Sequence, residues 1–310
     1  MPLISADTAP DAADTPANAT RLYAILARQA RTAVVFRRGP SRQVQLIRWN
    51  LRDDTFEHGQ WFKGRIYERR CDLSPSGKHL VYFAATHRAP HGTWTAVSRP
   101  PYFSALVLWP KGDAWGGGGL FQDEHTLLLN HAPAPDGTWP LAPGFTPPPR
   151  LQVRSLGPSA GRGEDEPLQG LLRERDGWQL VDAGKGGRGS VRAKTLFTFS
   201  RPQVMARPGP SGPSLQQRLH AVGPENDAFY AFSHRVVDAE GAVLADLGRS
   251  DWADWEGGDV VFARAGRLYR LRKNRIATYA AQGDAALQLL HDFRAARFTE
   301  LAPSAQALKW

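Results

Sequence analysis

The amino-acid sequence predicts an all-β protein. Aromatic residues, which fit pleated sheets better than helices, are frequent, with ten Trp, fourteen Phe and seven Tyr in 310 residues. Thirty Gly and twenty-four Pro indicate many chain reversals. Between these turn residues the apolar residues form short runs that partly alternate with polar residues, as half-buried strands do. These three features favour many short antiparallel strands and little helix.

The first unit of the chain lies within residues 20–62. Four strand-like runs follow one another there, RLYAILAR, AVVFRRG, VQLIRWN and the FEHGQWF region. The segments QART, GPSR and RDD separate them and carry turn residues. In the third run, Val44, Leu46 and Trp49 partly alternate with polar residues, as in a half-buried strand. Four antiparallel strands in about forty residues are typical of one blade of a β-propeller.

The most specific stretch is CDLSPSGKHLVYFAA, residues 71–85. Its Ser-Pro-Ser-Gly segment at 74–77 predicts a tight turn, because Pro75 presets φ and Gly77 tolerates a positive φ. The apolar run Leu80–Phe83 then predicts a strand. The stretch resembles the Asp-x-Ser-Pro-x-Gly-x-x-Leu signature of the WD-like repeats of TolB-type proteins. This resemblance implies that the hairpin is the inner half of one propeller blade.

Turn positions that recur along the chain predict the number of blades. The spacings between successive markers run from 31 to 53 residues, close to the ~40–50 residues of one blade. We therefore expect a β-propeller with six four-stranded blades, and five or seven blades stay open. The markers are Gln29, Ser74, Asp123, Asp176, Pro224 and Trp255.

Later segments repeat this plan with one interruption. Residues 67–112 and 251–273 resemble the first unit, and residues 115–131 restart it. Residues 132–170 contain nine Pro and one strand-like run, which predicts a long surface insertion within a blade. The apolar spacing at 287–293 fits a helix or an outer strand, and we favour the strand.

The domain organisation follows from the composition. Residues 1–18, rich in Ala, Asp, Thr and Pro, predict a disordered arm, and 19–310 predict a single propeller domain. The arm lacks the basic and apolar parts of a secretory signal. The longest largely apolar run, Tyr102–Trp109, has eight residues with Ser104 among them, whereas a membrane helix needs about 20. We expect a cytoplasmic monomer with no membrane segment.

The chain is basic, with a formal net charge of +9. Such a balance is common in nucleic-acid-binding proteins. However, only seven of the 39 basic residues are Lys, and Ala, Gly and Pro are abundant, as GC-rich coding would produce. The basic run at 264–275 fits a solvated edge strand or an anion-binding stripe. We therefore do not expect a nucleic-acid partner.

The candidate binding segment is 94–119, WTAVSRPPYFSALVLWPKGDAWGGGG. It combines aromatic residues with Arg, the residue types that dominate protein interfaces. Four glycines follow Trp115 and allow another backbone or a ligand to approach closely. We predict that Arg99, Tyr102 and Trp115 bind a protein partner. The alternative is that the tryptophans pack between blades, as we expect for Trp109.

An enzyme is the alternative class of function. Propeller glycosidases carry carboxylates near the mouth of the central channel, and their chemistry needs a suitably spaced pair. Asp72, Asp123, Asp251 and Asp254 lie on or near predicted inner strands. They fit a hydrolase or lyase that acts on a sugar or peptide-like substrate. Alternatively, these carboxylates cap turns and strand ends.

No motif predicts a metal or a cofactor. GKGGRGS at 184–190 lacks the residue order of a phosphate-binding P-loop. His87 and His91 have the spacing of a helical metal pair, but Pro90 between them excludes that helix. Cys71, the sole cysteine, lies in a predicted strand and is expected to pack as a small apolar residue. The leading expectation is thus a non-catalytic scaffold that binds a protein partner.

Overall fold

The computed structural model of the chain describes residues 20–39, 42–189, 195–223 and 228–310. Strands make up 46% of the chain and helices 8%, so the all-β prediction is confirmed. The described residues form five sheets, whereas the turn spacing favoured six units. The arm predicted at residues 1–18 lies outside the described residues.

The first sheet confirms the four-stranded unit predicted within residues 20–62. Its strands pair antiparallel in chain order. The apolar run of its second strand is buried on both faces, because Val34 and Phe36 enter one core and Ala33 and Val35 enter another. The strands are β1 (Arg21–Leu26), β2 (Thr32–Arg38), β3 (Gln43–Asn50) and β4 (Thr55–Lys63).

The second sheet contains the tight turn predicted at residues 74–77. The Gly77 N–H donates to the Ser74 carbonyl at 2.8 Å, and Gly77 has a φ of +74°. The strand after the turn is buried along its whole length, as its apolar sequence predicts. The elements are β5 (Arg65–Ile66), η1 (Glu68–Arg70), β6 (Asp72–Leu73), β7 (Leu80–Ala85), β8 (Thr93–Ser98) and β9 (Ala105–Pro110).

The third sheet has three strands and draws one of them from the Pro-rich insertion. β10 (Gly119–Phe121) pairs antiparallel with β11 (Thr126–Leu129), and β12 (Gln152–Ser155) then pairs parallel with β11. Helix α1 (Leu168–Arg175) follows. Its Leu168 and Leu172, four residues apart, pack on Leu120 of β10 and fix the helix beside this sheet.

The fourth sheet has six strands. β15 is its longest strand, and it pairs on one side with both β13 and β14. The segment GKGGRGS contributes β14, so its described part is a strand where a turn was expected. The strands are β13 (Gln179–Asp182), β14 (Lys185–Arg188), β15 (Phe197–Pro208), β16 (Ser214–Val222), β17 (Tyr230–Val237) and β18 (Val243–Arg249).

The fifth sheet again has four strands in chain order. The segment 287–292, where helix and strand were alternatives, is a strand as favoured. Three short helices connect the last two strands: η2 (Lys273–Arg275), α2 (Tyr279–Gln282) and η3 (Gly283–Ala286). The strands are β19 (Trp252–Glu256), β20 (Asp259–Arg264), β21 (Arg267–Leu271) and β22 (Leu287–Asp292).

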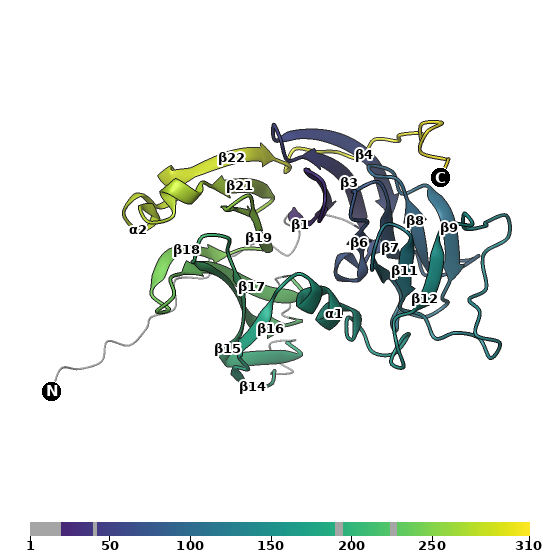
Figure 1. Ribbon diagram of the computed structural model, residues 1–310, viewed down its shortest axis with the longest axis horizontal. Coiled ribbons are helices and arrows are strands. Elements are labelled where there is room, and N and C mark those ends of the chain that lie inside the picture. The colour runs from purple at the N-terminus through teal and green to yellow at the C-terminus, as the bar shows by residue number, and fades with distance from the viewer. Residues whose placement is uncertain (1–19, 40–41, 190–194, 224–227) are drawn as a thin grey trace.

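The second sheet lies beside the first and the third, and the fifth lies beside the first and the fourth (Figure 1). β1 contacts β6 of the second sheet and β19 and β20 of the fifth, β10 contacts β6 and β7, and β16 and β17 contact β19. α1 lies between β10 and η1. Apolar cores fill the spaces between the first and second, first and fifth, second and third, and fourth and fifth sheets.

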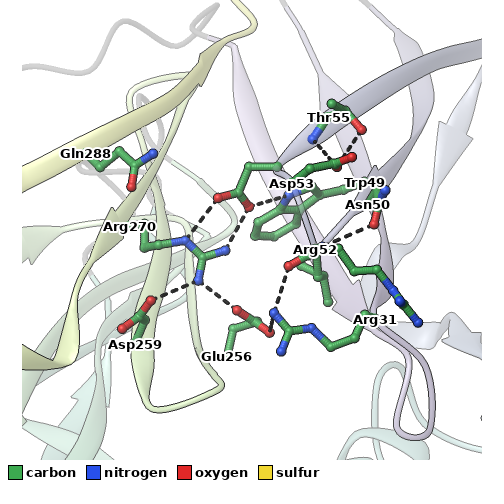
Figure 2. A network of polar contacts seen from close by, with 12 residues as sticks. Arg31, Trp49, Asn50, Arg52, Asp53, Thr55, Glu256, Asp259, Arg270 and Gln288 are labelled. Carbon is green, nitrogen blue, oxygen red and sulfur yellow. Dashed lines mark hydrogen bonds and ion pairs between the residues drawn. The ribbon is translucent and has the colours of Figure 1, made fainter.

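A buried ionic network joins the first and fifth sheets. Arg270 of β21 is only 2% exposed, and its guanidinium donates to Glu256 at 2.7 Å and to Asp259 at 3.2 Å. Figure 2 shows this guanidinium between the strands of the fifth sheet and the turn that carries Asp53. It also donates to both carboxylate oxygens of Asp54, at 2.7 and 3.2 Å, in the β3–β4 turn.

The C-terminal segment returns to the first two sheets. The Leu301 carbonyl accepts a bond from the Gln60 side chain at 3.0 Å, and Trp310 packs beside His79 with ring centroids 5.5 Å apart. Among the described residues, no helix has both the length and the apolar character that crossing a membrane requires.

Candidate functional site

A cavity of about 330 Å³ lies where the first strands of several sheets meet. β1 lines it along its whole length, opposite the C-terminal part of α1 and the start of β17. β19 and the segment around β6 complete the wall, near the middle of the molecule (Figure 1). The volume falls within the range of small-molecule pockets, about 300–1,000 Å³. The cavity is therefore the candidate functional site.

The described lining of this cavity carries more positive than negative groups. Seven arginines face five carboxylates, which leaves an excess of two positive charges when all are ionised. Low-dielectric walls strengthen the field of such an excess. The lining therefore favours an anion over a cation. The charged residues are Arg21, Arg28, Arg38, Arg69, Arg173, Arg175 and Arg207 with Glu68, Asp72, Asp176, Asp251 and Asp254.

One part of the lining is a closed set of ion pairs. Arg175 of α1 donates to both oxygens of Asp72, at 2.6 and 3.0 Å, and to both oxygens of Asp176, at 2.8 and 3.1 Å. The Phe121 N–H also donates to Asp72, at 2.8 Å. Burial raises the pKa of Asp72, while Arg175 opposes this rise. These groups already satisfy one another and offer little to a ligand.

Arg28 lies exposed at the rim beside this set. Its guanidinium donates to the Phe121 carbonyl at 2.7 Å. Among the described residues, no carboxylate lies within ion-pairing distance of it. Partial burial and then Arg175 lower the pKa of Arg28. Arg28 thus brings positive charge to the entrance without a partner of opposite charge.

Arg173 of α1 is a partly buried cation of the lining with a long ion pair. Its side chain is 20% exposed, and its Nη1 lies 3.7 Å from a Glu166 oxygen on a side chain that is 63% exposed. Burial, and then repulsion by Arg69, lower the pKa of Arg173 to about 10. Arg69 itself pairs with Asp165 at 3.2 Å and stacks over the Tyr230 ring. Two guanidinium groups therefore crowd one wall of the cavity.

Two polar side chains near Arg173 lack hydrogen bonds within the described part of the chain. Gln169 lies one helical turn before Arg173 and is 5% exposed, and its side-chain oxygen is buried without a partner. Its amide can rotate to present the NH₂ group instead. The Tyr23 hydroxyl, on strand β1, also has no hydrogen-bond partner among the described residues, and burial raises its pKa. Both groups can donate to an anion held by Arg173.

The opposite wall carries a carboxyl group that titrates near neutral pH. Asp254 of β19 pairs with Arg207, and burial raises the pKa of Asp254 to about 6 in spite of this arginine. Below that pH the group becomes neutral. The positive excess of the lining therefore grows as the pH falls.

The carboxylates proposed for an enzyme do not form a free acid–base pair. Asp72 and Asp254 line the cavity, but Arg175 and Arg207 hold them. Asp251 also lines it and accepts from the Leu22 N–H at 3.4 Å. Asp123 lies outside the lining and caps its own turn, where it accepts from the His125 N–H at 2.8 Å.

The structure does not bring the three predicted binding residues together. Arg99 and Tyr102 lie in the β8–β9 loop and line a second hollow, of about 640 Å³, against the C-terminal segment. Trp115 lies beyond the other end of β9, a strand of six residues that spans about 20 Å. Trp115 is 58% exposed, whereas Trp109 is 2% exposed and belongs to a core as expected.

The glycines after Trp115 serve packing. A Cβ on Gly118, whose φ is +77°, would lie 1.9 Å from the Arg70 carbonyl oxygen. The Arg70 guanidinium in turn donates to the Ala114 and Gly116 carbonyls, each at 2.7 Å. Close approach of another backbone, one of the two roles foreseen for this run, is therefore its role here.

The described residues provide no ligand set for a metal. No group of three or more His, Cys, Asp or Glu side chains in that part of the chain could hold an ion. Cys71 is buried in the core beside Leu73, and burial raises the pKa of its thiol well above the ordinary value. Its predicted packing role is confirmed.

The sequence alone did not identify the arginines of the cavity as site residues. Three distant segments of the chain contribute Arg28, Arg69 and Arg173. Because the chain has 32 arginines, nothing in the sequence distinguishes these three from the others. A signal for α1 was present, because Leu168, Leu171 and Leu172 have the spacing of one helix face. That helix would have placed Gln169 and Arg173 on a shared face.

Comparisons with known proteins place the chain in no family. No family model matches it, and no curated protein matches it. Among solved structures, a crystal structure of an uncharacterised protein from Listeria monocytogenes EGD-e is similar over 80% of this chain and 91% of that one. The sequence identity is 7% and the TM-score is 0.32.

Proposed function

We propose that the protein is a non-catalytic β-propeller that binds an anionic ligand in its central cavity. The contacts of the first sheet with the second and fifth, of the second with the third, and of the fourth with the fifth support five blades around one axis. The turn at 74–77, which resembles the repeat of TolB-type propellers, supports the same fold. The central cavity then corresponds to the mouth of the propeller channel, where propellers bind ligands.

The observation that carries the proposal is the position of Arg173. A partly buried cation whose ion pair is long, here 3.7 Å to Glu166, costs folding free energy, so its presence favours another reason. The guanidinium, the Gln169 amide and the Tyr23 hydroxyl lie on facing walls of one cavity and together offer donors for an oxyanion. An anion would supply the missing negative charge.

The ion pairs of the cavity favour binding over catalysis. A general acid or base needs a carboxyl group that can reach the substrate. Asp72 already accepts three hydrogen bonds, from Arg175 and from the Phe121 N–H. The hydrolase or lyase alternative would require these pairs to open first.

The test is phosphate binding by Arg173→Gln. We expect wild-type protein to bind inorganic phosphate in isothermal titration at low ionic strength, where charge interactions are least screened. The variant loses charge-assisted hydrogen bonds worth about 1.5–3 kcal/mol, so its affinity should fall at least about tenfold. Arg201→Gln is the matched control, because Arg201 lies outside the cavity, is 65% exposed and carries the same charge.

The stability of the same variant gives an independent readout. Removal of this partly buried, poorly compensated charge should leave the thermal midpoint of the ligand-free variant equal to or above that of wild type. A residue retained for folding would behave in the opposite way. Equal phosphate affinity in wild type and Arg173→Gln would refute the proposal, as would an absence of binding of both phosphate and carboxylate anions by wild type.

A protein partner is the second candidate, and the exposure of Trp115 favours it. A Trp that is 58% exposed is a typical anchor for an interface. Arg99 and Tyr102, on the far side of β9, would belong to a different contact. Capture from an extract of the native host by wild type, but not by Trp115→Ala, would support a partner at this loop.

A further inference from the structure

We infer that the ligand of the central cavity is an aromatic anion, a carboxylate or phosphate group attached to a flat apolar ring. This inference rests on the proposed function, which assigns the anionic group of the ligand, and it adds the apolar ring. Two observations carry it, the size of the cavity and the aromatic residues of its wall.

The cavity is too large for an inorganic anion alone. Its volume is about 330 Å³. A cavity of about 150 Å³ holds a benzene molecule. The space therefore has room for one ring together with one anionic group and its hydrogen-bond partners.

The wall is enriched in aromatic side chains. Seven of the thirty lining residues are Phe, Tyr or Trp, more than twice the 10% that these residues contribute to the whole chain. Such a wall offers a ring edge-to-face and stacked contacts. The aromatic residues come from β1, the segment after α1, the start of β17 and β19.

Phe229 is the aromatic residue most available to a ligand. It directly precedes β17, lines the cavity and is 37% exposed. Its neighbour Tyr230 is already engaged, because Arg69 stacks over its ring and its hydroxyl donates to Asp165 at 2.6 Å. The Phe229 ring touches Tyr230 at an edge, with an interplanar angle of 86°. The apolar half of the ligand is expected to cover Phe229.

The experiment compares pairs of probes that differ by a ring. Titration of the full chain with phenyl phosphate and inorganic phosphate measures the contribution of the ring on a phosphate. Benzoate and acetate form the corresponding pair for a carboxylate. We expect one phenyl probe to bind about tenfold more tightly than its ring-free partner, the effect of about 55 Å² of apolar surface removed from water. The pair that shows this gain identifies the head group.

Phe229→Ala should abolish the gain and leave the ring-free anion within about twofold of its wild-type affinity. Phe229→Leu keeps an apolar side chain without a flat face, and it replaces the alanine variant if that variant fails to fold. Trp115→Ala is the matched control, because it removes a larger exposed aromatic side chain outside the cavity and should keep the gain.

The outcomes separate this inference from the proposed function. Loss of the ring gain in Phe229→Ala, with retained binding of the ring-free anion, supports the aromatic anion. Equal affinities for phenyl phosphate and phosphate, and for benzoate and acetate, would overturn it even where Arg173→Gln weakens phosphate binding. Anion binding that is indifferent to Arg173 would instead overturn the proposed function, and this inference with it.

Discussion

Replacement of Arg270 by Met should destabilise the protein severely, because this residue neutralises three buried carboxylates at once. Asp54, Glu256 and Asp259 have side chains that are 18, 6 and 12% exposed. Met fills the space of the arginine stem but supplies no charge. The variant therefore leaves a negative cluster between the first and fifth sheets without its central cation.

The magnitude follows from the contacts. Arg270 makes four hydrogen bonds to the three carboxylates. Loss of one partner of a buried ion pair costs about 3–5 kcal/mol. Remaining donors limit the loss, because Arg31 still reaches Glu256 at 2.9 Å and the Trp49 indole N–H still reaches Asp54 at 3.0 Å. We expect the free energy of unfolding to fall by about 4 kcal/mol.

Urea unfolding followed by tryptophan fluorescence measures this change as a shift of the midpoint at constant m-value. Arg272→Met is the matched control. Arg272 is 50% exposed and reaches Asp259 at 3.2 Å, so its loss should cost less than about 1 kcal/mol. Equal midpoints for the two variants would refute the view that Arg270 links the two sheets.

Three further expectations concern the core, acid stability and the glycine run. In the same urea assay, Trp109→Ala should lower the free energy of unfolding by about 3–5 kcal/mol, because Trp109 is buried. Trp115→Ala should change it by no more than about 0.5 kcal/mol, because Trp115 is exposed. Similar losses in the two variants would contradict the assigned burial. Burial lowers the pKa of His131 and of His234 to about 3. The unfolded chain protonates these histidines near pH 6.5, whereas the folded chain does so only near pH 3. The free energy of unfolding should therefore be constant above pH 6.5 and should fall by about 1.4 kcal/mol per histidine for each pH unit below it. His131→Gln should reduce this slope, and identical slopes would disprove the assignment. Gly118→Ala should lower the thermal midpoint by several degrees, since its Cβ would clash with backbone, and an unchanged midpoint would contradict the close approach.

The sequence predicted the features that depend on residues adjacent in the chain. The turn at 74–77 and the strand that follows it were predicted because Pro75, Gly77 and the apolar run act within a few residues. The four strands of residues 20–62 were predicted for the same reason. Trp109 could be assigned to the core because it ends the apolar run of residues 105–109.

The sequence did not predict the features that depend on contacts between residues distant in the chain. The number of sheets depends on how β16 pairs with β17, because this pairing joins strands from two predicted units into one six-stranded sheet, which no local pattern encodes. The cavity depends on how Arg28, Arg69 and Arg173 meet around β1, although each alone resembles any surface arginine. Conversely, Arg99 and Trp115 are close in sequence, but β9 separates them. Short sequence distance did not produce a shared surface.

The most direct test of the central claim is a crystal structure of the protein soaked with 4-bromophenyl phosphate, with anomalous diffraction recorded at the bromine edge. The account predicts one bromine peak in the central cavity against Phe229, with the phosphate group within hydrogen-bonding distance of Arg173. Arg173→Gln crystals should lack this peak under the same conditions. Bromine peaks confined to the outer surface, with none in the central cavity, would contradict the account.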